Sequence, residues 1–503
     1  MISPETLGAP KRFSAWRPQQ VQALDWLVSH TKRFSEANLP VGTGKSLIAW
    51  AYPKLLGARA VILTETRGLQ DQYERDLREA GLYDIRGMQN YPCHALVDLE
   101  KCDAGPCLDG EACVWRNAGC AYFDREKEAA NAQIIVTNYA YWYAHESGVL
   151  GPRDVLICDE AHSLSDSITR AAGCSFTRHE LSFPEQSSGL ADWIEWGKAN
   201  HERFLPLLDP ESSLSRRQRK EVRALVKRLA RLAGADADTW GIEYTSRPEG
   251  VRFEPLLPTK YAESILFRGL PRVVLLSGTL RPGAIEELGV ARGDYAAIEM
   301  DSPFPVARRP IYWLETGVRV TGETSQTNLE FWAGKIDQVM TPRLRWKGVL
   351  HTVSYDRARF LKKHSRFAQH MYLHSPETTR EEVERFRNAA PPAILVSPSV
   401  HTGWDFPYEQ ARWQVIAKVP FPDTRTGIAA ARKEAVEHYI QKQAAVKLNQ
   451  MYGRIVRAED DLGETIIVDD SMKWLYSHFR PYFTKMFREA FQPVLVVPAP
   501  RIE

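Results

Sequence analysis

The chain has 503 residues, more than one hydrophobic core organises, so several domains are expected. Its 44% hydrophobic and 25% charged residues are those of an ordinary globular protein, and a formal net charge of +2 gives no global sign of a nucleic-acid partner. No apolar run approaches the roughly 20 residues that cross a bilayer, and the N-terminus lacks an apolar signal core. We therefore expect no membrane partner, no secretion and a cytoplasmic, reducing compartment in which cysteines act as ligands or core residues.

The first predicted element is an amphipathic helix that begins after Arg17 and contains Gln20. A glutamine amide donates and accepts hydrogen bonds at once, which suits the edge of an adenine ring. The alternative for Gln20 is a polar residue at a helix start. The helix lies one element ahead of the stretch that organises the chain.

That stretch is LPVGTGKS, residues 39–46, followed by a helix-forming run. Gly42, Thr43 and Gly44 permit a tight turn in which backbone N–H groups and a helix N-terminus face a polyphosphate. Lys45 would add a positive charge at the outer phosphates, and the Ser46 hydroxyl would help to hold Mg²⁺. The alternative is a chance glycine-rich turn, because Leu39 stands where the usual pattern has glycine.

After a strand and helix typical of a parallel sheet, the composition changes. Five of the seven cysteines lie in a window poor in core-forming residues: Cys93, Cys102, Cys107, Cys113 and Cys120. Such a segment needs a stabilising cross-link, and thiolates that bind a metal supply one. The wide spacing differs from the paired C-x₂-C of a zinc ribbon and favours an iron–sulfur cluster over zinc. Five candidates compete for four positions, and Cys102 is the suspected spare.

The string VLICDEAH, residues 155–162, combines a buried strand with two acids. We expect the strand to deliver Asp159 and Glu160 into solvent, as a Mg²⁺-holding acid and a water-activating acid. A solvated charged face is the alternative, but the position downstream of a phosphate-binding loop argues against it. Cys158 is expected in the core, and the role of Cys174 is open. These motifs predict hydrolysis of a nucleoside triphosphate.

Residues 176–262 lose the sheet pattern and predict a mostly helical insertion. Its helix SRRQRKEVRALVKRLARLAG buries one face and charges the rest, either as a solvated surface or as a phosphate-contacting one. The sheet pattern returns in a strand that ends at Ser277-Gly278-Thr279. These hydroxyls would either sense the γ-phosphate or cap a turn.

A second α/β set begins beyond Phe304 and includes a strand that ends near Asp405. Close to its end, QMYGRIVRAEDDLG predicts one helix face that carries Gln450, Gly453, Arg454 and Arg457. Arginines there would stabilise charge on a transferring phosphoryl group, as an arginine finger does. Structural salt bridging is the alternative.

The order of these motifs resembles the XPD/DinG family of superfamily II DNA helicases. The resemblance spans essentially the whole chain and includes the Gly-Thr-Gly-Lys loop, cysteines before DEAH, an insertion after it, SGTL, GWDFP and Q-x-x-G-R-x-x-R. It implies an α/β fold with two RecA-like parallel-sheet motor domains, the first carrying an iron–sulfur insertion and a helical arch insertion. The expected limits are 1–90, 126–175 and 263–300 for the first motor domain, 91–125 for the iron–sulfur domain, 176–262 for the arch and 301–503 for the second motor domain.

The same resemblance implies ATP, Mg²⁺ and a [4Fe–4S] cluster as cofactors. The expected catalytic residues are Lys45, Asp159, Glu160, Arg454 and Arg457. The expected nucleotide-binding residues are Gln20, Gly42, Thr43, Gly44, Lys45, Ser46, Asp405 and Gln450, with Ser46 and Asp159 at Mg²⁺. The expected cluster ligands are Cys93, Cys107, Cys113 and Cys120, with Cys102 as the alternative inner ligand.

We expect a monomeric helicase that moves 5′→3′ on single-stranded DNA and unwinds forked duplex DNA, as in a compact prokaryotic or viral-type member. One rival is a translocase that acts on RNA–DNA hybrids or protein–DNA complexes. Another is a metal-stapled, non-enzymatic DNA-binding scaffold. Protein partners are not indicated by the sequence.

Overall fold

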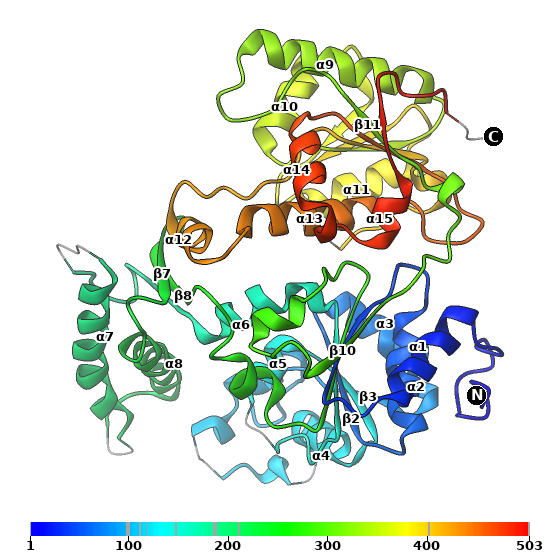
Figure 1. The fold of residues 1–503 in the computed structure, drawn as a ribbon. Coiled ribbons are helices and arrows are strands. Elements are labelled where there is room, and N and C mark those ends of the chain that lie inside the picture. The colour runs from blue at the N-terminus through cyan, green and yellow to red at the C-terminus, as the bar shows by residue number, and fades with distance from the viewer. Residues whose placement is uncertain are drawn as a thin grey trace.

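A computed structural model describes residues 2–96, 101–109, 112–117, 119–145, 148–184, 189–209, 212–400 and 403–500. Two parallel sheets, one above the other in Figure 1, dominate these described residues, and helices cover both faces of each sheet. The N-terminal half of the chain builds the lower sheet with two insertions, and the C-terminal part builds the upper sheet. The prediction of an α/β fold with two RecA-like sheets is confirmed.

The lower sheet contains seven strands in the described residues, in the order β10-β1-β9-β5-β2-β4-β3, and every pairing is parallel. Its strands are β1 (Phe34–Asn38), β2 (Ala60–Thr64), β3 (Leu82–Asp84), β4 (Ile134–Asn138), β5 (Val155–Asp159), β9 (Arg272–Ser277) and β10 (Tyr295–Glu299). The helices around it are α1 (Pro18–Ser29), α2 (Lys45–Leu55), α3 (Arg67–Leu77), α4 (Ala121–Asn131), α5 (Tyr139–Ala144) and α6 (Leu164–Ala172). The central strands are apolar along their length, because a parallel sheet is covered on both faces.

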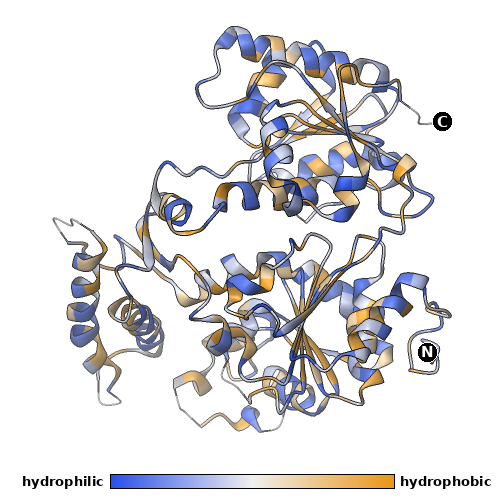
Figure 2. Ribbon diagram, viewed as in Figure 1, coloured by the Kyte–Doolittle hydropathy of each residue, from blue (hydrophilic) through white to orange (hydrophobic). Residues whose placement is uncertain are grey.

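The upper sheet also has seven strands among the described residues, in the order β13-β14-β12-β15-β16-β11-β17. Its strands are β11 (Ile311–Leu314), β12 (Gly348–His351), β13 (Met371–Leu373), β14 (Ile394–Ser397), β15 (Trp413–Ile416), β16 (Glu464–Ile467) and β17 (Phe491–Val494). Its helices are α9 (Gln326–Met340), α10 (Tyr355–His364), α11 (Thr379–Asn388), α12 (Gly427–Ala435), α13 (Tyr439–Tyr452), α14 (Ser471–Phe479) and α15 (Lys485–Ala490). Figure 2 shows hydrophobic strands enclosed between mixed helices in both halves.

The sequence predicted a mostly helical insertion after α6, and the structure shows strands as well as helices there. It contains β6 (Cys174–Thr177), α7 (Leu190–Phe204), α8 (Arg216–Ala233), β7 (Trp240–Ser246) and β8 (Glu249–Pro255). The three strands form an antiparallel sheet in the order β6-β8-β7, on which the helical hairpin packs. The sequence did not predict β7, because several of its residues are polar and its C-terminal end is exposed. At the other end of this insertion, β7 lies against α12 of the upper half.

The cysteine-rich insertion lies between β3 and α4 and contains only short 3₁₀ turns in its described residues. They are η2 (Met88–Asn90), η4 (Cys102–Ala104), η5 (Pro106–Asp109) and η6 (Val114–Arg116). None of the described helices is long and apolar enough to cross a bilayer.

A buried ion pair lies within the upper half. Arg343 and Glu464 expose 1% and 5% of their side chains, and Arg343 Nε lies 2.6 Å from Glu464 Oε1. Arg343 also donates to the carbonyl oxygens of Val339 (2.8 Å) and Pro498 (2.9 Å), so it ties α9 and the C-terminal segment to β16. Burial raises the pKa of Glu464, and the guanidinium opposes that effect.

We predict that Arg343→Met lowers the free energy of unfolding by about 3–5 kcal/mol, because the carboxylate of Glu464 is then left buried without a partner. Adding Glu464→Gln should recover part of this loss, since no buried charge remains. The exposed pair Arg359–Asp356 provides the control, for which Arg359→Met should cost less than about 1 kcal/mol. Urea unfolding followed by circular dichroism measures all three. An Arg343→Met loss as small as the control's would contradict the prediction.

Candidate active site

The phosphate-binding loop joins β1 to α2, and its two inner glycines have left-handed φ angles of +88° at Gly42 and +78° at Gly44. A Cβ at Gly42 would lie 2.2 Å from the ring of Phe304, and one at Gly44 would lie 2.3 Å from Gln20 Nε2. Thr43 is fully buried and donates its hydroxyl to the Pro40 carbonyl oxygen (2.9 Å). Thr43 therefore shapes the loop from inside and can meet a phosphate only through its backbone. The first N–H groups of α2 stay available to an anion.

Gln20 lies over this loop at the start of α1. Its Oε1 accepts a hydrogen bond from the Arg17 backbone N–H (2.9 Å), and Arg17 Nη1 donates to the Gly42 carbonyl oxygen (2.5 Å). Beside them is a cavity that Arg12, Phe13 and Gln20 line together with Gly44 and Ser46. Sequence reasoning found Gln20 but missed Arg12 and Phe13, which precede the first predicted element.

Asp159 is the last residue of β5, and only 1% of it is exposed, so the expected delivery into solvent is wrong for this carboxylate. Its Oδ1 accepts from the Glu160 backbone N–H (2.9 Å) and its Oδ2 from the Tyr73 hydroxyl (2.8 Å). Burial, and next the charge of Glu160, raise the pKa of Asp159 to about 6, although Lys45 and Tyr73 oppose the shift. Sequence reasoning missed Tyr73, because a tyrosine on the buried face of a helix indicates core packing.

Glu160 adopts a left-handed φ of 52°, and one third of its side chain is exposed. Burial alone would raise its pKa, but the hydrogen bond with His162 and the charges of Lys45 and Arg454 lower it overall. Two adjacent carboxyl groups thus differ: Glu160 is ionised, and Asp159 titrates near neutrality. Such divergence is typical of groups with distinct chemical roles.

A hydrogen-bonded series leads from Glu160 to the upper half of the molecule. His162 Nδ1 lies 3.3 Å from Glu160 Oε2 and 2.9 Å from Ser277 Oγ. The other ring nitrogen, Nε2, lies 2.6 Å from Gln450 Nε2 on α13. Ser277 Oγ also accepts from the Thr279 backbone N–H (3.1 Å), so Ser277 caps a turn and contacts the DEAH segment at once.

The prediction that Gln450, Arg454 and Arg457 share one helix is wrong. The helix α13 ends at Tyr452, where Gly453 caps it, so both arginines lie beyond its end. Both guanidinium groups are held by one carboxylate. Asp405 Oδ1 lies 3.1 Å from Arg454 Nη1, and Asp405 Oδ2 lies 2.7 Å from Arg457 Nη2. Asp405 therefore contacts the arginines and not the phosphate-binding loop.

Residues from both halves line one cavity between the two sheets. The lower wall carries Val41, Lys45, Glu160, His162, Gly278 and Thr279, and the upper wall carries Asn449, Gln450, Gly453, Arg454 and Arg457. A lysine, a carboxylate with a lowered pKa and two arginines thus line one cavity. An anionic ligand that changes its charge distribution during a reaction would be contacted from both sides.

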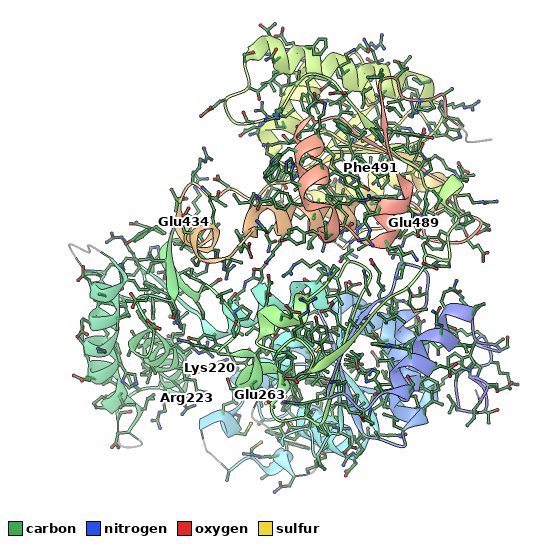
Figure 3. All side chains as sticks on the ribbon, in the orientation of Figure 1. Lys220, Arg223, Glu263, Glu434, Glu489 and Phe491 are labelled. Carbon is green, nitrogen blue, oxygen red and sulfur yellow. The ribbon has the colours of Figure 1, made fainter. Side chains whose placement is uncertain are left out.

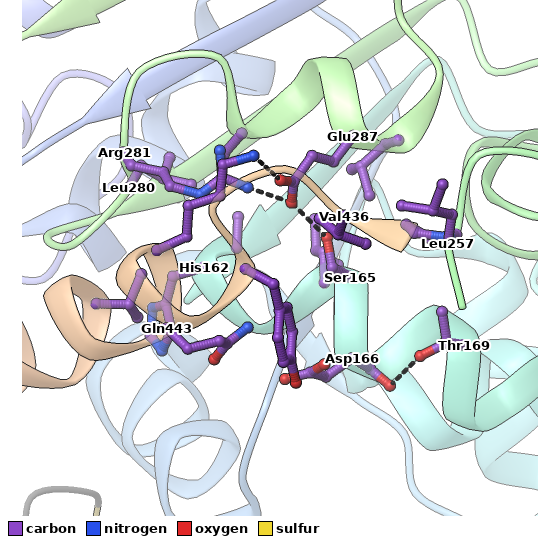
Figure 4. A pocket seen from close by; sticks show the side chains of 18 of the residues that line it. His162, Ser165, Asp166, Thr169, Leu257, Leu280, Arg281, Glu287, Val436 and Gln443 are labelled. Atoms are coloured by element: carbon purple, nitrogen blue, oxygen red, sulfur yellow. Dashed lines mark hydrogen bonds and ion pairs between the residues drawn. The ribbon is translucent and has the colours of Figure 1, made fainter. Parts of the chain in front are cut away.

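A second cavity lies between the halves, nearer the insertion (Figure 4). Glu287 is central to its ion pairs. It contacts Arg281 of the lower half and Lys442 Nζ of α13 (3.1 Å), and it accepts from the Ser165 hydroxyl (3.3 Å).

Arg432 of α12 forms the other charged bridge at this cavity. The residue is only 8% exposed, and it donates to Asp166 Oδ1 (3.0 Å) and Thr169 Oγ1 (2.7 Å) on α6. It also donates to Glu254 Oε2 (3.0 Å) on β8 of the insertion. One side chain of the upper half therefore contacts both the lower half and its insertion.

The cysteines of the first insertion lie close to one another. Cys93, Cys102 and Cys120 are buried, and Cys107 and Cys113 are partly buried. Burial, with Cys120 and Cys93 nearby, raises the pKa of Cys102 to about 12, and its Sγ donates to the Pro92 carbonyl oxygen (3.1 Å). Burial, and then Cys113 and Cys120, raise the pKa of Cys107. In the described part of the chain, no three His, Cys, Asp or Glu side chains are placed to hold a single metal ion.

Glycine at position 105 permits this approach. A Cβ there would lie 3.2 Å from Cys93 Sγ and 3.6 Å from Cys107 Sγ. Two basic side chains of α8 also reach this segment (Figure 3): Lys220 Nζ lies 3.6 Å from Asp103 Oδ2, and Arg223 Nη1 donates to the Leu108 carbonyl oxygen (3.0 Å). Part of the basic helix face therefore contacts the cysteine segment, which neither alternative from the sequence had foreseen.

Comparisons with known proteins agree with this architecture. Residues 349–490 match the family model described as Helicase C-terminal domain, and residues 13–182 match Type III restriction enzyme, res subunit. The ATP-dependent helicase DinG of Mycobacterium tuberculosis and that of Mycobacterium bovis are each 22% identical over 439 residues, which is 73% of this chain and 66% of the relative. The chain thus spans just under two thirds of the length of these curated relatives.

Solved structures show the same fold. An XPD helicase aligns with a TM-score of 0.64 at 14% identity, over 95% of this chain and all of that chain. Xpd4 of S. tokodaii aligns with a TM-score of 0.58 at 14% identity, again over 95% and 100%. Together these matches support the predicted resemblance to the XPD/DinG family of superfamily II helicases. The fold that this resemblance implied is confirmed.

The raised pKa of Asp159 has a consequence for the stability of the folded protein. Its folded-state pKa of about 6 exceeds the ordinary 3.8, so the ionised carboxylate destabilises the folded state at high pH, and protonation removes the cost as the pH falls. We predict that the isosteric Asp159→Asn raises the free energy of unfolding by about 3 kcal/mol at pH 8, and that the gain largely disappears at pH 4. Thermal unfolding across this range measures it, with Asn at the exposed Asp294 as control. A variant less stable than the parent at pH 8 would refute this assignment of charge.

Proposed function

We propose that the chain is an ATP-driven motor that moves on single-stranded DNA and unwinds forked duplex DNA. One observation supports this most directly: Lys45 and Glu160 line one wall of a cavity, and Arg454 and Arg457 line the opposite wall. Closure of the two halves on a triphosphate would bring all four to the same phosphoryl group. The division into motor domains, cysteine domain and arch stays as predicted, and the two sheets support it.

The roles follow from the geometry of the site. The base would occupy the cavity beside Gln20, and the phosphates would accept from the loop at Gly42–Gly44, with Lys45 at the outer ones. Ser46 and Asp159 offer the hydroxyl and carboxylate oxygens that Mg²⁺ prefers, and the ion would neutralise charge on the phosphates.

Glu160, ionised and hydrogen-bonded to His162, would orient and deprotonate the attacking water. Arg454 and Arg457 would exchange their contacts with Asp405 for oxygens of the transferring phosphoryl group. Asp405 would then act as a holder of the arginines between turnovers. A change in the position of the DEAH segment would move α13 through the hydrogen bond between His162 and Gln450.

We further propose that the cysteine segment holds a [4Fe–4S] cluster. Burial and the neighbouring thiols raise the pKa of Cys102 and of Cys107, an effect that thiolate ligation to a cluster would relieve. Cys93, Cys107, Cys113 and Cys120 are the proposed ligands, and the bond from Cys102 to a backbone carbonyl supports its place as the spare. Directionality 5′→3′, a monomeric state and a cytoplasmic location are carried over from the sequence analysis as proposals.

Lys45→Ala should reduce DNA-stimulated ATP hydrolysis by at least about 100-fold, because the outer phosphates lose their fixed cation. Lys54→Ala, at the far end of the same helix, is the control, since Lys54 packs over the ring of Trp50 away from the loop. Phosphate release and strand displacement on DNA forks are measured together, with RNA–DNA forks in parallel. Unchanged turnover in Lys45→Ala would refute the site, and displacement of hybrids alone would favour the rival substrate.

The protein purified without oxygen should be brown, absorb near about 400 nm and contain about four irons with matching sulfide. Cys107→Ser should lose this absorbance. Cys102→Ser should keep it, with Cys174→Ser as a control for a buried thiol outside the segment. A colourless protein with stoichiometric zinc would overturn the cluster, and loss of iron in Cys102→Ser would overturn the choice of ligands.

A further inference from the structure

The proposed Mg²⁺ site has an unusual neighbour in Tyr73. This residue lies on α3, which follows β2, and none of it is exposed. Its hydroxyl donates to Asp159 Oδ2 at 2.8 Å and also interacts with the hydroxyl of Ser46. The same phenol oxygen therefore contacts both side chains that are proposed to hold the ion, one from the phosphate-binding loop and one from the DEAH strand.

The contact with Asp159 is of the stronger kind. A hydrogen bond to a carboxylate inside a protein is shorter and stronger than one between neutral groups. Burial, and then the charge of Asp159, raise the pKa of Tyr73 well above its ordinary value, so the phenol keeps its proton. With Oδ1 bound by the Glu160 N–H and Oδ2 by Tyr73, the plane of the carboxylate is fixed, and each oxygen retains a lone pair.

A second tyrosine provides an internal comparison. Tyr139 is 4% exposed, and its hydroxyl donates to the backbone carbonyl oxygen of Asp159, also at 2.8 Å. Both tyrosines thus bond to the same residue at the same distance. Only Tyr73 touches the carboxylate and Ser46.

We propose that Tyr73 is a positioning residue that holds the Asp159 carboxylate and the Ser46 hydroxyl at the separation that Mg²⁺ requires. The inference rests on the proposed nucleotide site and extends it to a buried residue that lies outside the linings of both proposed nucleotide cavities. Hydrogen-bond partners of metal-binding carboxylates set ligand orientation, and their removal typically lowers metal affinity about 10- to 100-fold. Without the phenol oxygen, Ser46 and Asp159 would each reorient independently.

The test compares Tyr73→Phe with Tyr139→Phe, each of which removes one buried hydroxyl and keeps the ring. Calorimetry measures ADP affinity over a range of Mg²⁺ concentrations and in EDTA, without turnover. We expect Tyr73→Phe to weaken Mg²⁺ binding about 10- to 100-fold and to leave ADP binding in EDTA unchanged. Tyr139→Phe should match the parent in both, and kcat of Tyr73→Phe should recover at high Mg²⁺.

A double-mutant cycle with Ser46→Ala provides a second measurement. If Tyr73 acts through Ser46, the double variant should lose clearly less than the product of the two single losses. Unchanged or tighter Mg²⁺ binding in Tyr73→Phe, or an equal loss in Tyr139→Phe, would overturn the inference. Failure of the parent protein to bind Mg²⁺ and ADP would instead refute the proposed nucleotide site.

Discussion

The adjacent carboxylates at the end of β5 are the constraint on which the rest of the site depends. Asp159 is buried, and a buried negative charge must be hydrogen-bonded or paired. Three neighbours stabilise the two carboxylates. The charge of Lys45 acts on both, Tyr73 donates a hydrogen bond to Asp159, and His162 contacts Glu160. These partners do not fully offset burial, which still raises the pKa of Asp159. The ionised carboxylate therefore lowers the stability of the folded protein.

The same electrostatics join the two halves. His162 contacts Gln450 of α13, while Arg432 of α12 bonds to α6 and to β8 of the insertion. Any rotation of the upper sheet against the lower one therefore moves the insertion or breaks these contacts. Because Arg432 is buried among acids, loss of its partners would be costly. Motion at the cavity lined by Lys45 and Arg454 and motion of the insertion are therefore physically coupled. Asp405 adds a third element, since it holds Arg454 and Arg457 in the absence of another anion.

The insertions show two ways of stabilising a segment with a small core. The arch-like insertion has its own cluster of buried aromatic and aliphatic side chains between α7, α8 and a three-stranded sheet. The cysteine segment has short 3₁₀ turns instead, and it relies on close thiols and on the basic side chains Lys220 and Arg223 of α8. The contacts of Lys220 and Arg223 therefore attach the cysteine segment to the arch-like insertion, which has the larger core.

The sequence by itself determined the phosphate-binding loop, the DEAH strand and the two-sheet fold, because glycine conformation and apolar strand runs are local properties. It misjudged the exposure of Asp159 and the extent of α13, which packing and the cap at Gly453 decide. Only the tertiary structure placed Tyr73 between Ser46 and Asp159, Asp405 on the two arginines, and Arg432 across the junction. These are contacts between residues far apart in the chain, and a local pattern carries no record of which distant side chain will meet a given charge.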